Sequence, residues 1–460
     1  MAGQWPHGRS RLTVRHRRRS TPVKIEAINT WVDDRIGEGV FDVNRDVYLN
    51  PELFELEMKH IFEGSWLYLC HESQIPNSGD FFTTHMGRQP VFLVRGKDGQ
   101  VGGFVNACAH RGATLCRTRK GNQQFFTCPY HGWVYDTAGK NVDIKDHASG
   151  AYPPAFEAQS HDLTAIPKLE SYRGFVFGSL GTDVPTLAEH LGAAAPIIDL
   201  MADQSPEGLE VLRGSSTYTY NSNWKLQAEN GVDGYHVTSV HANYVSMVQR
   251  RMALGKEDKV KAIVGGGDIT KMTSGAYDLG MGHSLLWGEV PGANDRPLAQ
   301  RRAEIEQRLG PVKAHWMINR SRNLGLFPNV FLMDQTSTQI RVFRPLAIDK
   351  TEVTIFCVAP RGESASARTR RVRQYEDFFN ATGMATPDDL SEFEACQAGN
   401  QGLAGTVQHL DRGLDRVIHG ADDAARSIGA TPNTVGPNWA DENIFHSFYR
   451  RWRDLLSRPR

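Results

Sequence analysis

The spacing of hydrophobic and polar residues divides the chain into parts of different character. From about residue 29 to residue 63, apolar side chains recur at mostly helical intervals, which predicts helical structure. Between about residues 64 and 182 the pattern changes to short β-rich runs separated by turn residues. The dipeptide Asp98-Gly99 between two apolar runs is a strong hairpin signal. This middle part is therefore predicted to be a small all-β domain.

A second sheet is predicted in the part of the chain that follows. Its expected strands are at residues 217–220, 329–333, 339–343 and 352–358. Helices are expected at residues 193–201 and 368–379. The fold class is thus α+β, with the small β domain (64–182) inserted into a larger domain built from residues 29–63 and 183–460.

Composition and charge narrow the function classes. The chain has 460 residues, and Lys plus Arg and Asp plus Glu both number 52. The balanced charge gives no overall electrostatic field that would favour binding to nucleic acid or to an anionic membrane surface. No apolar run approaches the roughly 20 residues of a membrane-spanning helix. Six cysteines without a disulfide framework are typical of a reducing compartment, and we expect a cytoplasmic location.

The N-terminal segment stands apart from the rest. Residues 1–24 contain seven Lys or Arg and no Asp or Glu, and no apolar segment follows them, so they do not form a secretory signal. A basic tail of this kind could contact nucleic acid or resemble an organellar presequence. We favour a disordered basic extension over residues 1–28.

Two pairs of cysteine and histidine form the clearest chemical signal in the chain. They read Cys-Ala-His (Cys108, His110) and Cys-Pro-Tyr-His (Cys128, His131), with seventeen residues between the pairs. In a [2Fe–2S] cluster of the Rieske kind, one iron takes two thiolates and the other takes two imidazoles. Each pair would then supply one ligand to each iron, so the spacing predicts a Rieske cluster.

A structural zinc site is the alternative for these four residues, because two cysteines and two histidines can also bind zinc. Zinc sites of this composition usually begin with two cysteines and close with two histidines. Each pair here contains one cysteine and one histidine instead, so the Rieske interpretation is favoured.

A second group of candidate metal ligands lies within residues 229–241. Asp233 and His236 are three residues apart, which puts them on one face of a helix. His241 is five residues further, about 140° around an ideal helix, so all three can meet only if the helix ends or bends. Two histidines and one carboxylate form the facial triad of non-haem Fe(II) oxygenases. Taken alone, this spacing indicates only a surface or core role.

Together, the two groups resemble the large (α) subunit of the Rieske non-haem iron aromatic-ring-hydroxylating dioxygenases. The resemblance runs from about Asp42 to the C-terminal region. Residues 226–237, 333–342 and 373–380 are most similar to the benzoate and toluate 1,2-dioxygenase group, which includes anthranilate and 2-halobenzoate enzymes. The resemblance implies a Rieske domain at 64–182 and a catalytic domain whose antiparallel sheet wraps around helices in a helix-grip-like fold.

The resemblance also implies roles for individual residues. His236 and His241 would bind a mononuclear Fe(II), with Asp389 as the third ligand and Asp388 as the runner-up. The alternative for this Asp pair is a helix N-terminus, where acids complement the helix dipole. Asn230 would lie next to the iron.

Electron transfer is expected to cross between subunits. The route implied by the resemblance runs from His131 of one chain to Asp233 and His236 of the next. Function then requires a ring of subunits, implied to be an α3β3 hexamer with small β subunits.

The implied reaction inserts both atoms of O2 into a benzoate-like aromatic carboxylate to give a cis-dihydrodiol carboxylate. Electrons would come from NADH through a separate ferredoxin-type reductase, because no Gly-x-Gly-x-x-Gly turn for a nicotinamide is present. The alternatives are a Rieske-type monooxygenase or demethylase, an anthranilate or 2-halobenzoate dioxygenase, and a pure Rieske electron carrier. Arg341 and Arg344 are candidates for the substrate carboxylate by charge only, and a structural or solvated role is expected for both.

Overall fold

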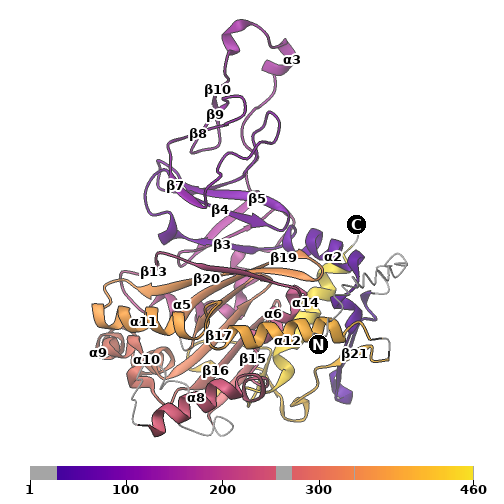
Figure 1. Cartoon of the computed structure of the whole chain (residues 1–460), viewed down its shortest axis with the longest axis vertical. Helices are drawn as coiled ribbons and strands as arrows, with labels where there is room; N and C mark the ends of the chain where they lie inside the picture. The colour runs from indigo at the N-terminus through magenta and orange to yellow at the C-terminus, as the bar shows by residue number, and fades with distance from the viewer. Residues whose placement is uncertain (1–27, 255–271, 336, 403, 459–460) are drawn as a thin grey trace, which may run out of the picture.

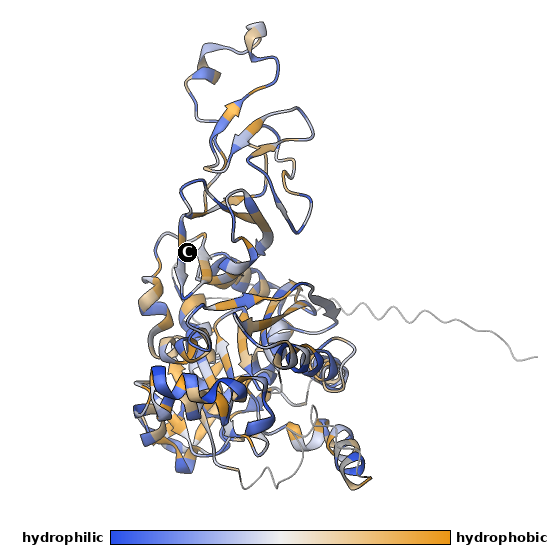
Figure 2. Ribbon diagram, turned by 90° about the vertical axis from the view of Figure 1, so that its left-hand side faces the viewer, coloured by the Kyte–Doolittle hydropathy of each residue, from blue (hydrophilic) through white to orange (hydrophobic). Residues whose placement is uncertain are grey.

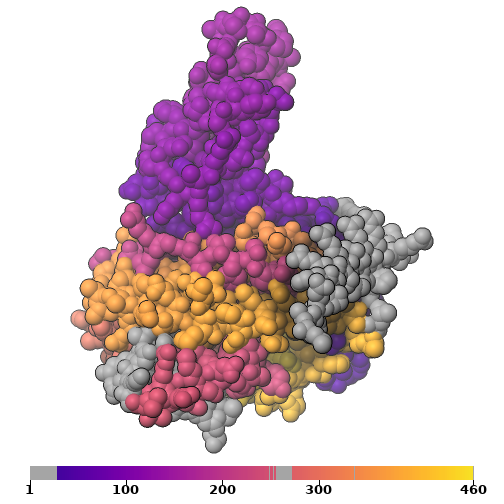
Figure 3. All heavy atoms as spheres, in the orientation of Figure 1, coloured from indigo at the N-terminus to yellow at the C-terminus, as the bar shows by residue number. Residues whose placement is uncertain are grey.

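A computed structural model describes residues 28–254, 272–335, 337–402 and 404–458. Figure 1 shows a slender domain of short strands that protrudes from a broader domain of strands and helices. Figure 3 shows the same protruding domain in space-filling form. The predicted N-terminal tail lies almost entirely outside the described residues.

The slender domain is built from short antiparallel strands in three small sheets. Their orders are β6-β5-β4-β7, β10-β9-β8 and β11-β12-β3. The bounds are β3 (Leu67–His71), β4 (Asp80–Met86), β5 (Gln89–Arg95), β6 (Val101–Val105), β7 (Lys120–Asn122), β8 (Phe125–Thr127), β9 (Val134–Asp136), β10 (Asn141–Asp143), β11 (Lys168–Tyr172) and β12 (Phe175–Ser179). The predicted hairpin at Asp98-Gly99 is confirmed, because β5 and β6 pair across it and Gly99 has a left-handed φ of 80°.

The broad domain is organised around one ten-stranded antiparallel sheet. Its order is β13-β20-β19-β18-β17-β16-β15-β23-β22, with β14 also paired to β20. The bounds are β13 (Leu209–Val211), β14 (Ser216–Tyr220), β15 (Ser274–Gly280), β16 (His283–Glu289), β17 (Arg320–Leu326), β18 (Val330–Asp334), β19 (Thr338–Ala347), β20 (Lys350–Pro360), β22 (Ile418–His419) and β23 (Thr434–Gly436). Figure 2 shows apolar strands in the middle of this domain and more polar helices around them.

Helices flank this sheet. They are α4 (Leu187–Leu191), α5 (Ala195–Ala202), α6 (Trp224–Asn230), α7 (Val237–Val240), α8 (Ala242–Ala253), α9 (Arg302–Leu309), α10 (Pro311–Ile318), α11 (Ala365–Asp377), α12 (Thr386–Gly399), α13 (Asp423–Arg426) and α14 (His446–Leu456). The predicted α+β class is confirmed, and the strands and helices expected after residue 183 are all present within a few residues. None of the described helices is both long and apolar enough to cross a membrane.

The helical prediction for residues 29–63 is wrong in its first half. The segment contains β1 (Val32–Arg35), β2 (Val40–Asn44), α2 (Pro51–Glu57) and the π-helical turn η3 (Met58–Phe62). In β2, Phe41 and Val43 are buried while the residues around them are only half-buried, which is the two-residue period of a strand. β2 also pairs with β21 (Val407–His409), a partner far along the chain that the local pattern does not show.

Candidate metal centres

The two Cys/His pairs lie in loops of the slender domain with the same backbone turn. The carbonyl of Cys108 accepts a hydrogen bond from Gly112 N at 2.8 Å, and that of Cys128 accepts one from Gly132 N at 2.9 Å. Both glycines have a left-handed φ, 70° and 75°, which a residue with a Cβ rarely adopts. Each loop therefore turns back on its cysteine in the same way, with the histidine inside the turn.

The loops bring like ligands together. Cys108 and Cys128 are buried, and the rings of His110 and His131 have centroids 4.6 Å apart. Burial raises the pKa of the Cys108 thiol, and the neighbouring Cys128 adds to this effect. A pair of thiols beside a pair of imidazoles suits a two-iron cluster, in which each iron takes one kind of ligand.

A single zinc ion fits this arrangement less well. Tetrahedral zinc requires all four ligand atoms to converge on one point. In the described part of the chain, two groups of three residues bring their metal-binding atoms within 4.8 Å of one another, and the four Cys and His residues are not among them. One group is the second centre described below. The other is Asp42, His409 and Asp411, of which two are exposed, and we assign it no ion.

Tyr135 is a residue of this centre that the sequence reasoning missed. Its hydroxyl accepts a hydrogen bond from Ala109 N at 3.1 Å and lies 3.1 Å from Cys108 Sγ. Because the hydroxyl oxygen already accepts from Ala109, its proton is free to point at the sulfur. Trp133 stacks on His110, with ring centroids 4.9 Å apart. The aromatic residues that directly follow the second Cys/His pair are the sequence signal that could have indicated this role. Only the structure shows which atoms they contact.

The second centre lies where α6 ends and α12 begins. Nε2 of His241 is 3.2 Å from Oδ1 of Asp389, and Nε2 of His236 is 3.5 Å from the same oxygen. Asn230 Nδ2 donates to that oxygen at 3.2 Å and lies 3.3 Å from His236 Nε2. Two imidazole nitrogens and a carboxylate thus meet within 4.8 Å, close enough to hold one metal ion.

Asp233 and His236 do not lie on a helix, contrary to prediction. They occupy the turn between α6 and α7, which contains two tightly packed glycines. A Cβ on Gly231 would lie 2.3 Å from the Phe331 ring, and one on Gly234 would lie 2.4 Å from the carbonyl oxygen of Trp439. The turn lets His241, the residue after α7, reach the same point as His236.

Asp233 nevertheless contacts His236. Its Oδ2 is 3.2 Å from His236 Nδ1, the ring nitrogen on the side away from Asp389. Burial alone would lower the pKa of His236, but Asp233 and Asp389 together outweigh it and raise that pKa. Asp233 is positioned to fix the ring, and it is not part of the group that meets at Asp389.

The structure separates the two adjacent acids of α12. Asp389 has a side chain only 7% exposed and faces both Nε2 atoms. Asp388 is 36% exposed, and its Oδ2 lies 3.8 Å from Nδ1 of His241. Both acids also lie in the first turn of α12, as the helix-start alternative expected.

Buried carboxylates hold α6 and thereby the second centre. Glu57 accepts hydrogen bonds from Trp224 Nε1 at 2.8 Å and from Lys225 Nζ at 2.5 Å. At the other end, Glu229 accepts one from the hydroxyl of Tyr48 at 2.6 Å, and burial raises the pKa of Glu229 to about 7. The N-terminal segment therefore anchors the helix that leads to Asn230 and His236.

The two candidate arginines of β19 differ. Arg344 is half-buried, and its Nη2 lies 3.1 Å from Oε1 of Glu352, which is the structural role expected for it. Arg341 is buried, and its Nε and Nη2 have no hydrogen-bond partner among the described residues.

The fold and these two centres define a class of oxygenase subunit, and comparison with known proteins identifies the family. Residues 209–458 match the family described as "Ring hydroxylating alpha subunit (catalytic domain)", and residues 65–169 match the "Rieske [2Fe-2S] domain". The chain belongs to the Rieske-type ring-hydroxylating dioxygenase α subunits. It is a dioxygenase subunit with a Rieske cluster and a mononuclear iron as cofactors. The alternative of a pure electron carrier is wrong, because the catalytic domain is present.

Relatives of known function cover nearly the whole chain. It is 48% identical to toluate 1,2-dioxygenase subunit alpha of Pseudomonas putida, with 94% of each chain covered. It is 47% identical to the 2-halobenzoate 1,2-dioxygenase large subunit of Burkholderia cepacia, covering 94% of this chain and 93% of that one. The predicted likeness to the benzoate and toluate group is confirmed. As a large subunit, the chain is one component of an enzyme that also includes a partner subunit and a reductase.

Solved structures support the fold independently. Naphthalene 1,2-dioxygenase with indole bound in the active site superposes with a TM-score of 0.78 at 24% identity, covering 91% of this chain and 92% of that chain. Because the identity is this low, the likeness concerns the fold alone.

Proposed function

We propose that this chain is the large subunit of a dioxygenase that converts a benzoate-like aromatic carboxylate and O2 into a cis-dihydrodiol carboxylate. The observation that carries the proposal is the chemistry named for its relatives. Toluate, 2-halobenzoate and anthranilate are all aromatic carboxylates, and the anthranilate 1,2-dioxygenase large subunit of Acinetobacter baylyi is 44% identical. NADH supplies the electrons through a separate ferredoxin-type reductase.

The ligand assignment forms part of the proposal. Cys108, Cys128, His110 and His131 hold the [2Fe–2S] cluster. His236, His241 and Asp389 would hold the iron, which would offer open coordination positions to O2, while the electrons would come from NADH through the reductase and the cluster. The pairing of like ligands in the first centre and the convergence of donor atoms in the second support this assignment.

Neighbouring residues keep the iron ligands in their working geometry. Asp233 Oδ2 lies 3.2 Å from Nδ1 of His236 and would hold the proton on that nitrogen, which would leave Nε2 free as a ligand. Asn230 donates to Asp389 and restricts the rotation of that carboxylate. The burial of His241 and Asp389 excludes bulk water from that side of the site.

We further propose that the enzyme works as an α3β3 hexamer with electrons crossing between chains. The cluster loops near β8 and β9 lie at the outer part of the projecting domain, away from α6 and α12 (Figure 1). Tyr130, beside His131, is 56% exposed, and Tyr235, beside Asp233, is 52% exposed. Exposed aromatic residues at both ends of the proposed junction suit a contact between subunits.

Domain limits and location complete the proposal. The Rieske domain spans residues 64–182, and residues 29–63 and 183–460 form the catalytic domain. A cytoplasmic location agrees with six cysteines of which none forms a disulfide.

Oxygen uptake tests the proposal. The chain, its partner subunit and the reductase are combined with NADH and assayed on benzoate, toluates, anthranilate and 2-halobenzoates. Substrate-dependent uptake with at least one carboxylate, and none with benzene or biphenyl, is expected. Uptake with neutral arenes only would overturn the substrate class. A colourless protein with one zinc per chain would overturn the cluster assignment.

A further inference from the structure

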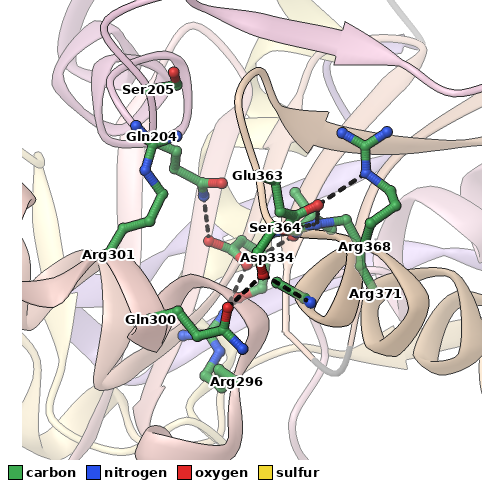
Figure 4. A network of polar contacts seen from close by, with 12 residues as sticks. Gln204, Ser205, Arg296, Gln300, Arg301, Asp334, Glu363, Ser364, Arg368 and Arg371 are labelled. Carbon is green, nitrogen blue, oxygen red and sulfur yellow. Dashed lines mark hydrogen bonds and ion pairs between the residues drawn. The ribbon is translucent and has the colours of Figure 1, made fainter.

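Four arginine side chains are buried in the described part of the chain, and one of them lacks an acidic partner. They are Arg296, Arg322, Arg341 and Arg371. Arg296 and Arg322 pair with Asp334, and Arg371 pairs with Glu363. Figure 4 shows Arg296, Asp334, Glu363 and Arg371 within one network of polar contacts. Arg341 makes no ion pair with any described acid. A buried guanidinium without a partner is costly, and its presence indicates that an anion arrives from outside.

The vacant edge of Arg341 has the shape of a carboxylate site. The residue is 2% exposed, and the two side-chain nitrogens without partners among the described residues are Nε and Nη2. Elsewhere in this chain Arg450 uses the same two nitrogens to hold both oxygens of Asp34, at 2.7 and 2.8 Å. Two parallel N–H groups match the two oxygens of a planar carboxylate, so the edge fits a substrate carboxylate group.

A wall of aromatic rings joins Arg341 to the proposed iron ligands. The guanidinium carbon lies 5.1 Å from the centre of the Phe379 ring, which restrains its plane. Phe379 packs edge-on against Phe378 with centroids 4.4 Å apart, and the Phe378 ring is 6.1 Å from that of His241. Such a wall suits the flat face of a benzene ring.

Tyr218 supplies a second polar atom near this wall. It lies on β14, which pairs with β20, and β20 pairs in turn with β19, the strand that carries Arg341. Its hydroxyl is buried and has no partner among the described residues. Burial raises the pKa of Tyr218, while Arg341 lowers it and Asp389 raises it, so the hydroxyl is within electrostatic reach of both residues.

We propose that Arg341 binds the carboxylate of the aromatic substrate through Nε and Nη2, with the Tyr218 hydroxyl as an additional donor. The inference rests on the proposed function and deepens it by assigning the carboxylate site. A two-point contact at one end of the ring fixes which ring carbons face His236, His241 and Asp389. It also explains how a site lined by aromatic rings selects a charged arene, because a neutral arene leaves the buried guanidinium unpaired.

The test compares Arg341→Gln with Arg344→Gln in the assembled, iron-loaded oxygenase. Arg344 is on the same strand but pairs with Glu352, so its variant is the matched control. Isothermal titration calorimetry measures the Kd of benzoate and of benzamide, which has the same shape without the charge. We expect Arg341→Gln to weaken benzoate binding by about 30-fold or more, the effect of removing one partner of a buried charge pair, and to leave benzamide within about threefold. Arg344→Gln should change neither Kd.

The outcomes separate this inference from the proposed function. If wild-type enzyme binds and oxidises benzoate and Arg341→Gln does so equally well, the site assignment is wrong and the function stands. If wild-type enzyme binds and oxidises no aromatic carboxylate, the proposed function fails first. An equal loss for benzoate and benzamide would show a purely structural role and overturn the inference. If Arg341→Gln does not assemble, Arg341→Lys makes the same test, because lysine keeps the charge but cannot form the two-point contact. Unchanged benzoate affinity in Arg341→Lys would overturn the inference.

Discussion

Asp233 lies 3.2 Å from Nδ1 of His236, while Nε2 of the same ring faces Asp389 at 3.5 Å. One imidazole therefore joins a half-buried carboxylate to the buried group that we propose as the iron site. In the proposed account Asp233 has two tasks, which are to hold the ring of His236 and to present a polar atom to a neighbouring subunit. The following predictions test these and other parts of the account.

Asp233→Asn should retain both metals and the oligomeric state but slow electron transfer to the iron. The variant keeps the side-chain volume and removes the negative charge that faces Nδ1 of His236. We expect oxidation of the reduced cluster to slow by about 100-fold, the upper range for residues that orient a metal ligand. Single-turnover kinetics of fully reduced protein with substrate and O2 measure this rate. The wild-type protein is the reference, and an unchanged rate in Asp233→Asn would contradict the bridging role.

The adjacent acids of α12 should differ in their effect on iron. Asp389→Ala removes the carboxylate that faces both Nε2 atoms, so iron content and turnover should be lost while the cluster absorbance remains. Asp388→Ala removes only a half-exposed contact 3.8 Å from His241 Nδ1, and about tenfold lower turnover with retained iron is expected. Iron analysis with visible spectroscopy measures both. The reverse order would show that Asp388 is the ligand.

Tyr135→Phe should lower the reduction potential of the cluster. The hydroxyl near Cys108 Sγ favours the reduced, more negative cluster, because hydrogen bonds to the sulfurs raise the potential. A net hydrogen-bond energy of about 0.5–1.5 kcal/mol corresponds to roughly 20–65 mV for one electron. Protein-film voltammetry measures the shift. Tyr130→Phe, which removes an exposed hydroxyl, should leave the potential unchanged, and an equal shift in both variants would rule out the specific contact.

The cluster ligands could be predicted from the sequence alone, because Rieske chemistry dictates both the residue types and the spacing of the two Cys/His pairs. The two histidines and the Asp pair of α12 could be predicted only through the resemblance to the dioxygenase family, because their spacing alone indicates no metal site. The two unpaired nitrogens of Arg341 could not be predicted, because only the structure shows that no described acidic side chain lies beside them. Its neighbour Arg344 looks the same in sequence and is paired with Glu352.

The fold was predicted least well where strands are buried on both faces or pair with strands far along the chain, because the hydrophobic pattern then does not show them. Nearly every residue of β15 and β16 is buried, so neither strand shows the alternation that identifies a strand with one exposed face. The β1–β2 hairpin was interpreted as helix because its pairing partner, β21, is more than 350 residues away. The turn at Asp233 depends on the packing of Gly231 and Gly234, which no local periodicity records.

Acid should destabilise the protein through buried neutral histidines. Nδ1 of His283 accepts from Phe327 N at 2.9 Å, and Nε2 lies 2.7 Å from the carbonyl oxygen of His190. Burial lowers the pKa of His283 from 6.5 to about 4, so the unfolded chain takes up the proton more readily than the folded one. Stability is therefore complete above pH 6.5 and is lost as the pH falls towards 4, by about 1.4 kcal/mol per pH unit for this group.

Thermal unfolding between pH 8 and pH 4.5 measures this dependence. His283→Gln offers an acceptor and a donor without a titrating ring, so its midpoint should fall less steeply with acid than that of the wild-type protein. Burial also lowers the pKa values of His71 and His446 to about 4. These two residues therefore cause part of the decrease in unfolding temperature with acid in both proteins. Identical slopes would show that His283 does not contribute.

The fate of the oxygen atoms tests the central claim most directly. The assembled enzyme, its reductase and NADH are supplied with benzoate under 18O2, and the product is analysed by mass spectrometry. The account predicts a cis-dihydrodiol carboxylate in which both new hydroxyl oxygens are 18O. A singly labelled phenolic product, or a diol with one oxygen from water, would contradict it and indicate a monooxygenase.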